Sequence, residues 1–133
     1  MVTLDVRTQH RDQFIKLDSL LENACLAQQW NDGLLFVFVP HTTAGITINE
    51  NADPDVTSDI LQVLDRLIPW TGPYAHAEGN TAAHVKACLM GSSVTVPVAS
   101  GKLRLGTWQS VFFCEFDGPR NRKVILRFLA TAD

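Results

Sequence analysis

Three of the four histidines occupy positions where a folded chain could present them to a ligand. His41 follows the apolar run 34–39 after a single proline, Pro40, and Thr42 and Thr43 come next. A strand that ends in such residues can present side chains and backbone N–H groups to a ligand. The same threonines could instead only satisfy turn amides, and for them we favour that role. For His41 both interpretations stay open. The remaining histidine, His10, lies among polar residues and is expected to face solvent.

A second polar cluster contains His76, Glu78, Asn80 and His84. Asn80 and His84 are four residues apart, so they share one face of a helix that begins at Asn80. Two of these imidazoles and His41 would make the three-histidine site that Zn²⁺ uses catalytically, with a fourth position open to water. A carboxylate, Glu50 or Glu78, could orient a ligand or act as a base. Asn80 could equally be a simple helix cap, and the spacing alone leaves metal binding open.

Further candidate binding residues are distributed along the chain. Residues 49–53 form a dense polar stretch that could hold a divalent cation or a substrate hydroxyl. The alternative is helix capping, which accounts for Asp53 but leaves Glu50 unexplained. Trp108 could be a core aromatic, which is the commoner case, or a stacking wall for a planar ligand. Arg120 could clamp a phosphate or a carboxylate. We interpret the neighbouring Arg122 and Lys123 as a solvated hairpin tip.

Hydrophobic periodicity indicates which elements position these residues. Strands are expected at 2–7, 14–17, 34–39, 45–49, 94–98, 110–116 and 123–130, and helices at about 20–29, 54–68 and 80–90. The continuous apolar run 34–39 is typical of a strand buried on both faces, and 45–49 is expected beside it. This order is not strict strand–helix alternation. It favours an α+β fold around a largely antiparallel sheet or sandwich.

The expected element ends depend on cap and turn residues. Asp53, followed by proline, is expected to cap the second helix, and Asn80 the third. Asp18 and Ser19 offer a cap for the first helix. Residues 117–121 contain Gly and Pro, so we expect them to join the last two strands as a hairpin.

Composition limits the class of protein. The chain has 133 residues, which predicts one domain spanning 1–133. The net charge of −3 and a pI near 5.7 argue against nucleic acid as a partner. No apolar run approaches the ~20 residues of a membrane span. The beginning of the chain has no signal-peptide pattern, so we expect a cytoplasmic protein whose three cysteines are reduced and buried.

Taken together, the motifs resemble those of the YjbQ-like family, some of whose members are described as secondary thiamine-phosphate synthase enzymes. The resemblance covers nearly the whole chain and rests on residues 39–44, 49–51, 76–84, 105–109 and 115–120. It implies an α+β fold, an antiparallel or mixed β-sandwich flanked by helices. It also implies a homotrimer with a cleft near the subunit interface, where histidines hold a metal ion in some members.

Carried over residue by residue, the resemblance implies a set of site residues. The catalytic candidates are His41, Glu50, His84 and Gln109. The ligand-binding candidates are Asn49, Asn51, Asn80, Trp108 and Arg120, with Glu78 nearby. The metal ligands would be His41, His76 and His84, holding a divalent ion, Zn²⁺ or Mg²⁺.

The expected function is therefore a small metal-binding transferase of the thiamine-phosphate synthase type, which joins an aminopyrimidine diphosphate to a thiazole phosphate. Its partner would be a small anionic metabolite, held locally by a metal or by Arg120 because the surface is not basic. Two alternatives stay open. One is a metal-dependent hydrolase, with Glu50 or Glu78 activating water. The other is a trimer that binds a small ligand without catalysis.

Overall fold

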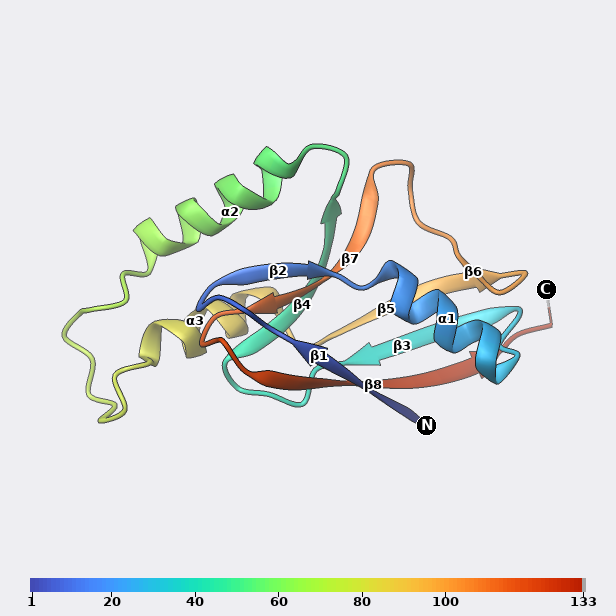
Figure 1. Cartoon of the computed structure of the whole chain (residues 1–133), viewed down its shortest axis with the longest axis horizontal. Coiled ribbons are helices and arrows are strands. Elements are labelled where there is room, and N and C mark those ends of the chain that lie inside the picture. Colours follow the sequence, from blue (N-terminus) through green and yellow to red (C-terminus); the bar gives the residue numbers. More distant parts are fainter. Residues whose placement is uncertain (133) are drawn as a thin grey trace.

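The computed structural model describes residues 1–132, and Asp133, the last residue of the expected domain 1–133, lies outside them. Figure 1 shows two sheets with helices packed on them. The elements, in chain order, are β1 (Val2–Arg7), β2 (Gln13–Lys16), α1 (Asp18–Gln28), β3 (Gly33–Phe38), β4 (Ala44–Glu50), α2 (Pro54–Leu67), α3 (Thr81–Met90), β5 (Ser93–Ala99), β6 (Lys102–Leu103), β7 (Gln109–Glu115) and β8 (Asn121–Ala130).

The strands form a five-stranded sheet in the order β1-β8-β3-β5-β6 and a three-stranded sheet in the order β2-β7-β4. Every strand pair is antiparallel. The α+β fold expected from the sequence is confirmed. Within the part of the chain described here, no helix is long and apolar enough to cross a membrane.

The three-stranded sheet is the middle layer of the molecule. Val111 and Phe113 of β7 point into the core shared with the large sheet and α1. The alternate residues Phe112 and Cys114 point the other way, into a second core under α2 and α3. Because successive side chains of a strand point to opposite faces, the apolar middle of β7, residues 111–114, is buried on both sides.

Three expectations about the strands are wrong. β7 and β8 are not a hairpin, because residues 117–120 carry the chain from the small sheet to the large one. β4 and β3 also lie in different sheets, so β4 pairs with β7 and not with β3. The run 34–39 is also not buried on both faces, since Leu34 and Phe36 are more than one-third exposed on the outer side of β3.

The helix ends agree only in part with expectation. The Asp53 carboxylate accepts a hydrogen bond from the Asp55 N–H at 2.9 Å, which confirms the expected cap of α2. Asp18 instead accepts from the Val111 N–H at 2.8 Å, and Leu17 takes the cap position of α1. The Asn80 side chain makes no cap hydrogen bond to α3. It donates a hydrogen bond instead to the Asp117 carboxylate, which lies between β7 and β8.

Candidate functional site

His41, His76 and His84 line one open pocket of about 440 Å³. They reach it from three segments: the chain after β3, the loop between α2 and α3, and the first turn of α3. The turn between β7 and β8 completes the pocket. The lining also includes Pro40, Thr42, Thr43, Glu78, Asn80, Asp117, Arg120 and Arg122. The structure therefore brings together the histidines, Asn80 and Arg120 predicted from the sequence.

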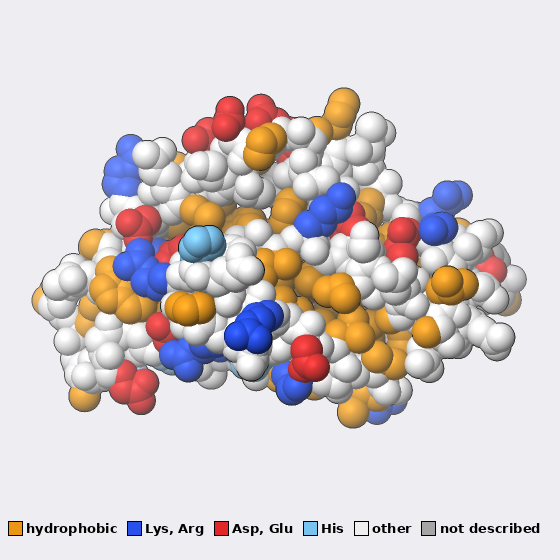
Figure 2. All heavy atoms as spheres, viewed as in Figure 1, with side chains coloured by type: hydrophobic (Ala, Val, Ile, Leu, Met, Phe, Trp, Pro, Cys, Tyr) orange, Lys and Arg blue, Asp and Glu red, His pale blue; other side chains and the backbone are white. Residues whose placement is uncertain are grey.

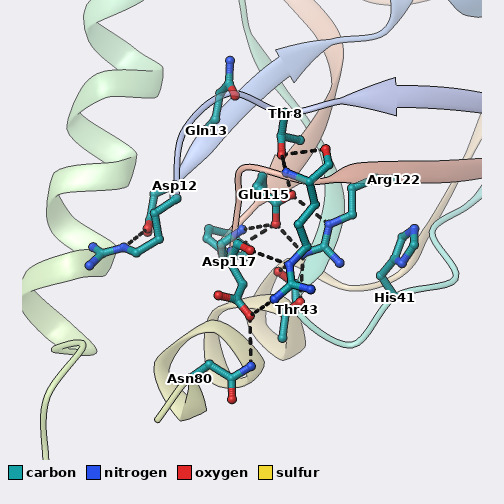
Figure 3. A network of polar contacts seen from close by, with 12 residues as sticks. Thr8, Asp12, Gln13, His41, Thr43, Asn80, Glu115, Asp117 and Arg122 are labelled. Carbon is teal, nitrogen blue, oxygen red and sulfur yellow. Dashed lines mark hydrogen bonds and ion pairs between the residues drawn. The ribbon is translucent and has the colours of Figure 1, made fainter. Parts of the chain in front are cut away.

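A buried ion pair underlies this pocket, and its arginine, Arg122, forms part of the pocket floor. The Glu115 side chain is fully buried, and the Arg122 side chain is 6% exposed. Arg122 Nε donates to Glu115 Oε1 at 2.8 Å, while its Nη2 donates to Oε2. Figure 3 shows the two side chains pointing toward one another, with Thr43 beneath them. Such a two-pronged contact between arginine and carboxylate holds both groups in one orientation.

Both members of this ion pair make further hydrogen bonds. Glu115 accepts from the Thr8 hydroxyl at 2.8 Å and from the backbone N–H groups of Phe116 and Asp117 at 3.1 and 3.0 Å. Arg122 Nη2 also donates to Thr43 Oγ1 at 2.8 Å. A buried charge is tolerated when it is paired and hydrogen-bonded in this way. The floor therefore presents a fixed guanidinium to the pocket.

A second carboxylate, Asp117, organises the rim. Its Oδ2 accepts from Asn80 Nδ2 and from Arg120 Nη2, both at 2.9 Å, and its backbone oxygen accepts from Arg120 Nε at 2.7 Å. This contact explains why Asn80 does not cap α3. Within residues 1–132, the two bonds from Arg120 to Asp117 use two of the five N–H groups of the guanidinium. The others remain for a ligand. The Arg120 side chain is 52% exposed at the mouth of the pocket.

His41 is held by the backbone of β8. Its Nε2 accepts a hydrogen bond from the Lys123 N–H at 2.9 Å. A neutral imidazole whose Nε2 is an acceptor carries its proton on Nδ1. Burial lowers the pKa of His41, and the nearby Arg122 lowers this pKa further because it disfavours a second positive charge. His41 is therefore neutral at pH 7 and can donate a hydrogen bond through Nδ1.

The other two histidines form a pair. The rings of His76 and His84 are perpendicular, with their centroids 5.5 Å apart. His76 Nε2 also lies 3.9 Å from a carboxylate oxygen of the exposed Glu78. His84 is anchored by α3, whereas His76 is carried by the exposed loop 68–80. Of the two, His84 is the better-positioned group for moving a proton.

The divalent metal implied by the resemblance does not fit the side-chain geometry of a single chain. Among residues 1–132, no three His, Cys, Asp or Glu side chains form a group that could hold a metal ion. The Nε2 lone pair of His41 is already engaged by the Lys123 N–H. Zinc requires lone pairs of several ligands to converge on one point. The metal therefore stays a prediction.

The other predicted site residues lie elsewhere in the chain. They are Asn49, Glu50, Asn51, Trp108 and Gln109. Glu50 is paired with Gln109 in the sheet, and the Asn51 N–H donates to the Trp108 backbone oxygen at 2.9 Å. This group, called the amide end below, stands at the end of β4, whereas His41 precedes its beginning. At about 3.3 Å per residue, the length of β4 separates them by about 20 Å.

The amide end has an exposed character. Trp108 is 63% exposed and is therefore not a core aromatic. Glu50 and Asn51 line a small hollow of about 240 Å³ together with Lys16. The Gln109 side chain accepts a local hydrogen bond from the Gly106 N–H at 2.8 Å. One chain thus does not unite the amide end with the histidine pocket.

Sequence reasoning missed Glu115 and misjudged Arg122. Arg122 is not part of a solvated tip, because its side chain is buried against Glu115. A signal for this was present: Glu115 interrupts an otherwise apolar stretch, 111–116, that is buried on both faces. A carboxylate in such a strand requires a buried partner. Lys123 is exposed, as expected for the tip.

The sequence was compared with protein-family models. Residues 2–131 match the model described as "UPF0047 protein YjbQ-like". The chain belongs to the YjbQ-like UPF0047 family. Its relatives in this family include YugU of Bacillus subtilis, which is 46% identical over 128 residues, covering 96% of this chain and 97% of the relative. UPF0047 protein MJ1081 of Methanocaldococcus jannaschii is 44% identical over 124 residues, covering 93% of this chain and 90% of the relative.

Solved structures that resemble this chain have the same fold. An uncharacterized conserved protein of this family from Clostridium acetobutylicum is 53% identical and superposes with a TM-score of 0.93, covering 97% of this chain and 100% of its own. The conserved hypothetical protein TT1486 from Thermus thermophilus is 43% identical with a TM-score of 0.92 and the same coverage. The expected YjbQ-like architecture is confirmed.

Proposed function

We propose that this chain is an enzyme that acts on a small anionic metabolite in the histidine pocket, and that its reaction is a transfer of the thiamine-phosphate synthase type. The observation that carries the proposal is the convergence of His41, His84, Asn80 and Arg120, from separate segments, on one pocket. Proton donors and acceptors gathered with a guanidinium in a hollow are typical of a catalytic site.

The roles of the residues follow from their contacts. Arg120, exposed at the mouth, offers N–H donors to phosphate oxygens. His41 offers its Nδ1–H as a further donor to an oxygen that gains negative charge during the reaction. His84 is the candidate for accepting or releasing a proton, because its imidazole lines the pocket from a position on α3.

Charge balance sets a condition on this proposal. Arg122 is paired with Glu115, and Arg120 with Asp117, so neither arginine is an unpaired cation. Affinity for an anion must then come from directed hydrogen bonds, or from a cation or a neighbouring subunit that supplies charge. We therefore expect modest affinity for inorganic phosphate and tighter binding of a larger ligand.

Product formation tests the proposal. The purified protein is incubated with Mg²⁺, the aminopyrimidine diphosphate and the thiazole phosphate, and thiamine phosphate is quantified. We expect product from the parent protein and from Val85→Ala, a neighbouring exposed position on α3, but not from His84→Ala. Equal product from the parent and His84→Ala would contradict the role of the pocket.

We further propose that the active form is a homotrimer in which the histidine pocket of one subunit meets the amide end of the next. The exposed apolar side chains support an oligomer. Leu67 of α2 is 71% exposed, Leu129 of β8 is 66% exposed, and the outer face of β3 exposes Leu34 and Phe36. Figure 2 shows hydrophobic side chains between α2 and the strands beneath it. Exposed apolar patches of this kind commonly mark protein interfaces.

Complementation between inactive variants tests the shared site. His84→Ala and Gln109→Ala are unfolded together in a 1:1 mixture and refolded. If the two residues act from different subunits, activity returns to about one quarter of the parental value, because a random mixture joins two intact halves at one interface in four. If both act within one chain, the mixture stays inactive. Sedimentation or light scattering measures the number of subunits.

Metal content is a separate measurement. If the predicted Zn²⁺ or Mg²⁺ is bound through ligands from adjacent subunits, elemental analysis of the native oligomer finds it, and His76→Ala lowers its amount. An oligomer without metal that keeps its melting temperature in chelator would remove both the metal and the alternative of a metal-dependent hydrolase. Binding of a ligand without turnover would instead favour the non-catalytic trimer, through a ligand-dependent rise in melting temperature.

A further inference from the structure

A second hollow adjoins the histidine pocket on the side of β4 and α3. Its volume is about 400 Å³. It shares His41, Thr42 and His84 with the histidine pocket, so the two imidazoles belong to the walls of both spaces. The residues that line this hollow alone are Ala44, Ala87, Cys88, Gly91 and Ser92. We call it the alanine hollow.

The two spaces differ in chemistry. The histidine pocket is lined by two arginines and two carboxylates. The described lining of the alanine hollow includes no Asp, Glu, Lys or Arg. Its lining side chains are small, because the side chains of Ala44 and Ala87 end at Cβ and Gly91 has no Cβ. An uncharged wall of this kind suits an uncharged part of a ligand, since a charge placed there would lose water without gaining a partner.

The alanine hollow is a fixed part of the fold. The end of α3 lies directly against β4: a Cβ added to Gly45 would lie 2.7 Å from the Gly91 backbone oxygen and 2.9 Å from the Met90 Cβ. The Ile46 N–H donates to the same Gly91 oxygen at 3.1 Å. Backbone contacts therefore set the distance between helix and strand, and the space does not depend on a mobile side chain.

We propose that the substrate has two parts: an anionic group that binds in the histidine pocket, and a small, uncharged aromatic ring that binds in the alanine hollow. The bond that reacts then lies between the two spaces, beside His41 and His84. This inference rests on the proposed function, because it takes the histidine pocket as the site of the anionic group. It adds a binding place for the ring and a specificity element, the surface formed by Ala44, Ala87 and Cys88.

Phenyl phosphate and inorganic phosphate are suitable probes, because they differ by one aromatic ring. Affinity is measured by calorimetry for the parent protein, for Cys88→Phe, which fills the hollow from an exposed position, and for Leu89→Phe. Leu89 is the next residue of α3 and does not line the hollow, so Leu89→Phe is the matched control. Circular dichroism checks that each variant is folded.

The parent and Leu89→Phe are expected to bind phenyl phosphate about tenfold or more tightly than inorganic phosphate, because the ring leaves water. In Cys88→Phe this advantage falls below about threefold while the affinity for inorganic phosphate is unchanged. If phosphate binds but the ring gives no advantage, or if Cys88→Phe keeps the advantage, the alanine hollow is not a subsite, although the proposed function still stands.

A second measurement does not depend on an anion. Cys25 and Cys114 are buried, and burial raises the pKa of both thiols, so iodoacetamide should alkylate Cys88 first. Benzyl alcohol, a neutral ring, should slow alkylation of Cys88 severalfold. It should not slow alkylation of a cysteine placed at Leu89 in a Cys88→Ser background. Equal rates with and without benzyl alcohol would overturn the proposal even for a protein that binds no phosphate.

Discussion

The two ends of the β4–β7 pair are built in opposite ways. At the histidine end, Glu115 and Arg122 are buried in a network of charged hydrogen bonds, and α3 contacts β4 through its backbone. At the amide end, Trp108 and Gln109 are exposed, and the Gln109 side chain bonds to the nearby Gly106 N–H. Both ends carry residues that the motifs single out for chemistry.

This difference indicates how firmly each end is held in place within one chain. Buried, fully hydrogen-bonded groups keep their orientation before a ligand arrives. Exposed side chains such as Trp108 can adopt several rotamers unless another group packs against them. The histidine end is therefore held in place by contacts within this chain, whereas the side chains of Trp108 and Gln109 at the amide end are exposed.

The largest expected effect comes from removing the buried carboxylate of the histidine end. Glu115→Ala leaves the Arg122 guanidinium buried without its partner. Breaking a buried ion pair in this way should lower the free energy of unfolding by about 3–5 kcal/mol. Urea denaturation measures the loss.

Glu78→Ala is the matched control for that change, because Glu78 also lines the histidine pocket but its side chain is 75% exposed. It should change the free energy of unfolding by less than about 0.5 kcal/mol. Similar values for the two variants would show that burial is not what distinguishes Glu115.

A smaller effect is expected from adding one methyl group at each end. The Cβ of Gly45→Ala would meet the Gly91 backbone oxygen at 2.7 Å, so β4 and α3 must move apart. We expect a loss of about 1–3 kcal/mol. The Cβ of Gly106→Ala meets only the tip of the Gln109 side chain, at 3.2 Å, which can turn away. Thermal unfolding measures the stability of both variants. Equal losses of stability would contradict the conclusion that the histidine end is packed more tightly than the amide end.

Much of the fold could be predicted from local patterns. The alternation in 2–7 and the proline after Asp53 depend on neighbouring residues, and both expectations hold in the structure. Strand pairing could not be predicted in the same way. Residues 110–116 and 123–130 have the pattern of a hairpin, but their partners lie in different sheets. The alternation of apolar and polar residues indicates that a strand is half-buried, but it does not indicate which sheet the strand joins.

The site shows the same limit. The motifs led to His41, His84, Asn80 and Arg120, which do share a pocket. They did not indicate that Arg122 is buried, because the run of basic residues there resembles an exposed tip. Cys88 was expected in the core, yet it is exposed on α3. Both errors concern which side of an element is covered, and that depends on contacts between distant segments.

Acid should weaken the histidine end through His41, by less than about 1 kcal/mol because water screens a partly exposed imidazole. Burial and Arg122 lower its pKa in the folded state. As the pH falls below about 6.5, His41 takes up a proton in the unfolded chain. In the folded chain its lower pKa keeps His41 neutral to lower pH, so stability falls. His41→Gln should lose less melting temperature between pH 7.5 and pH 5 than the parent. A parallel decline in both proteins would exclude His41 as a cause.

The smallest effect on stability is expected at the amide end. Gln109→Ala removes one exposed hydrogen bond, to the Gly106 N–H, and should change the free energy of unfolding by no more than about 0.5 kcal/mol. If the amide end of one subunit completes the histidine pocket of another, the same substitution should abolish formation of thiamine phosphate. A variant that is as stable and as active as the parent would leave the amide end outside the site. A stable but inactive variant would instead show that this exposed end is ordered for function and not for folding.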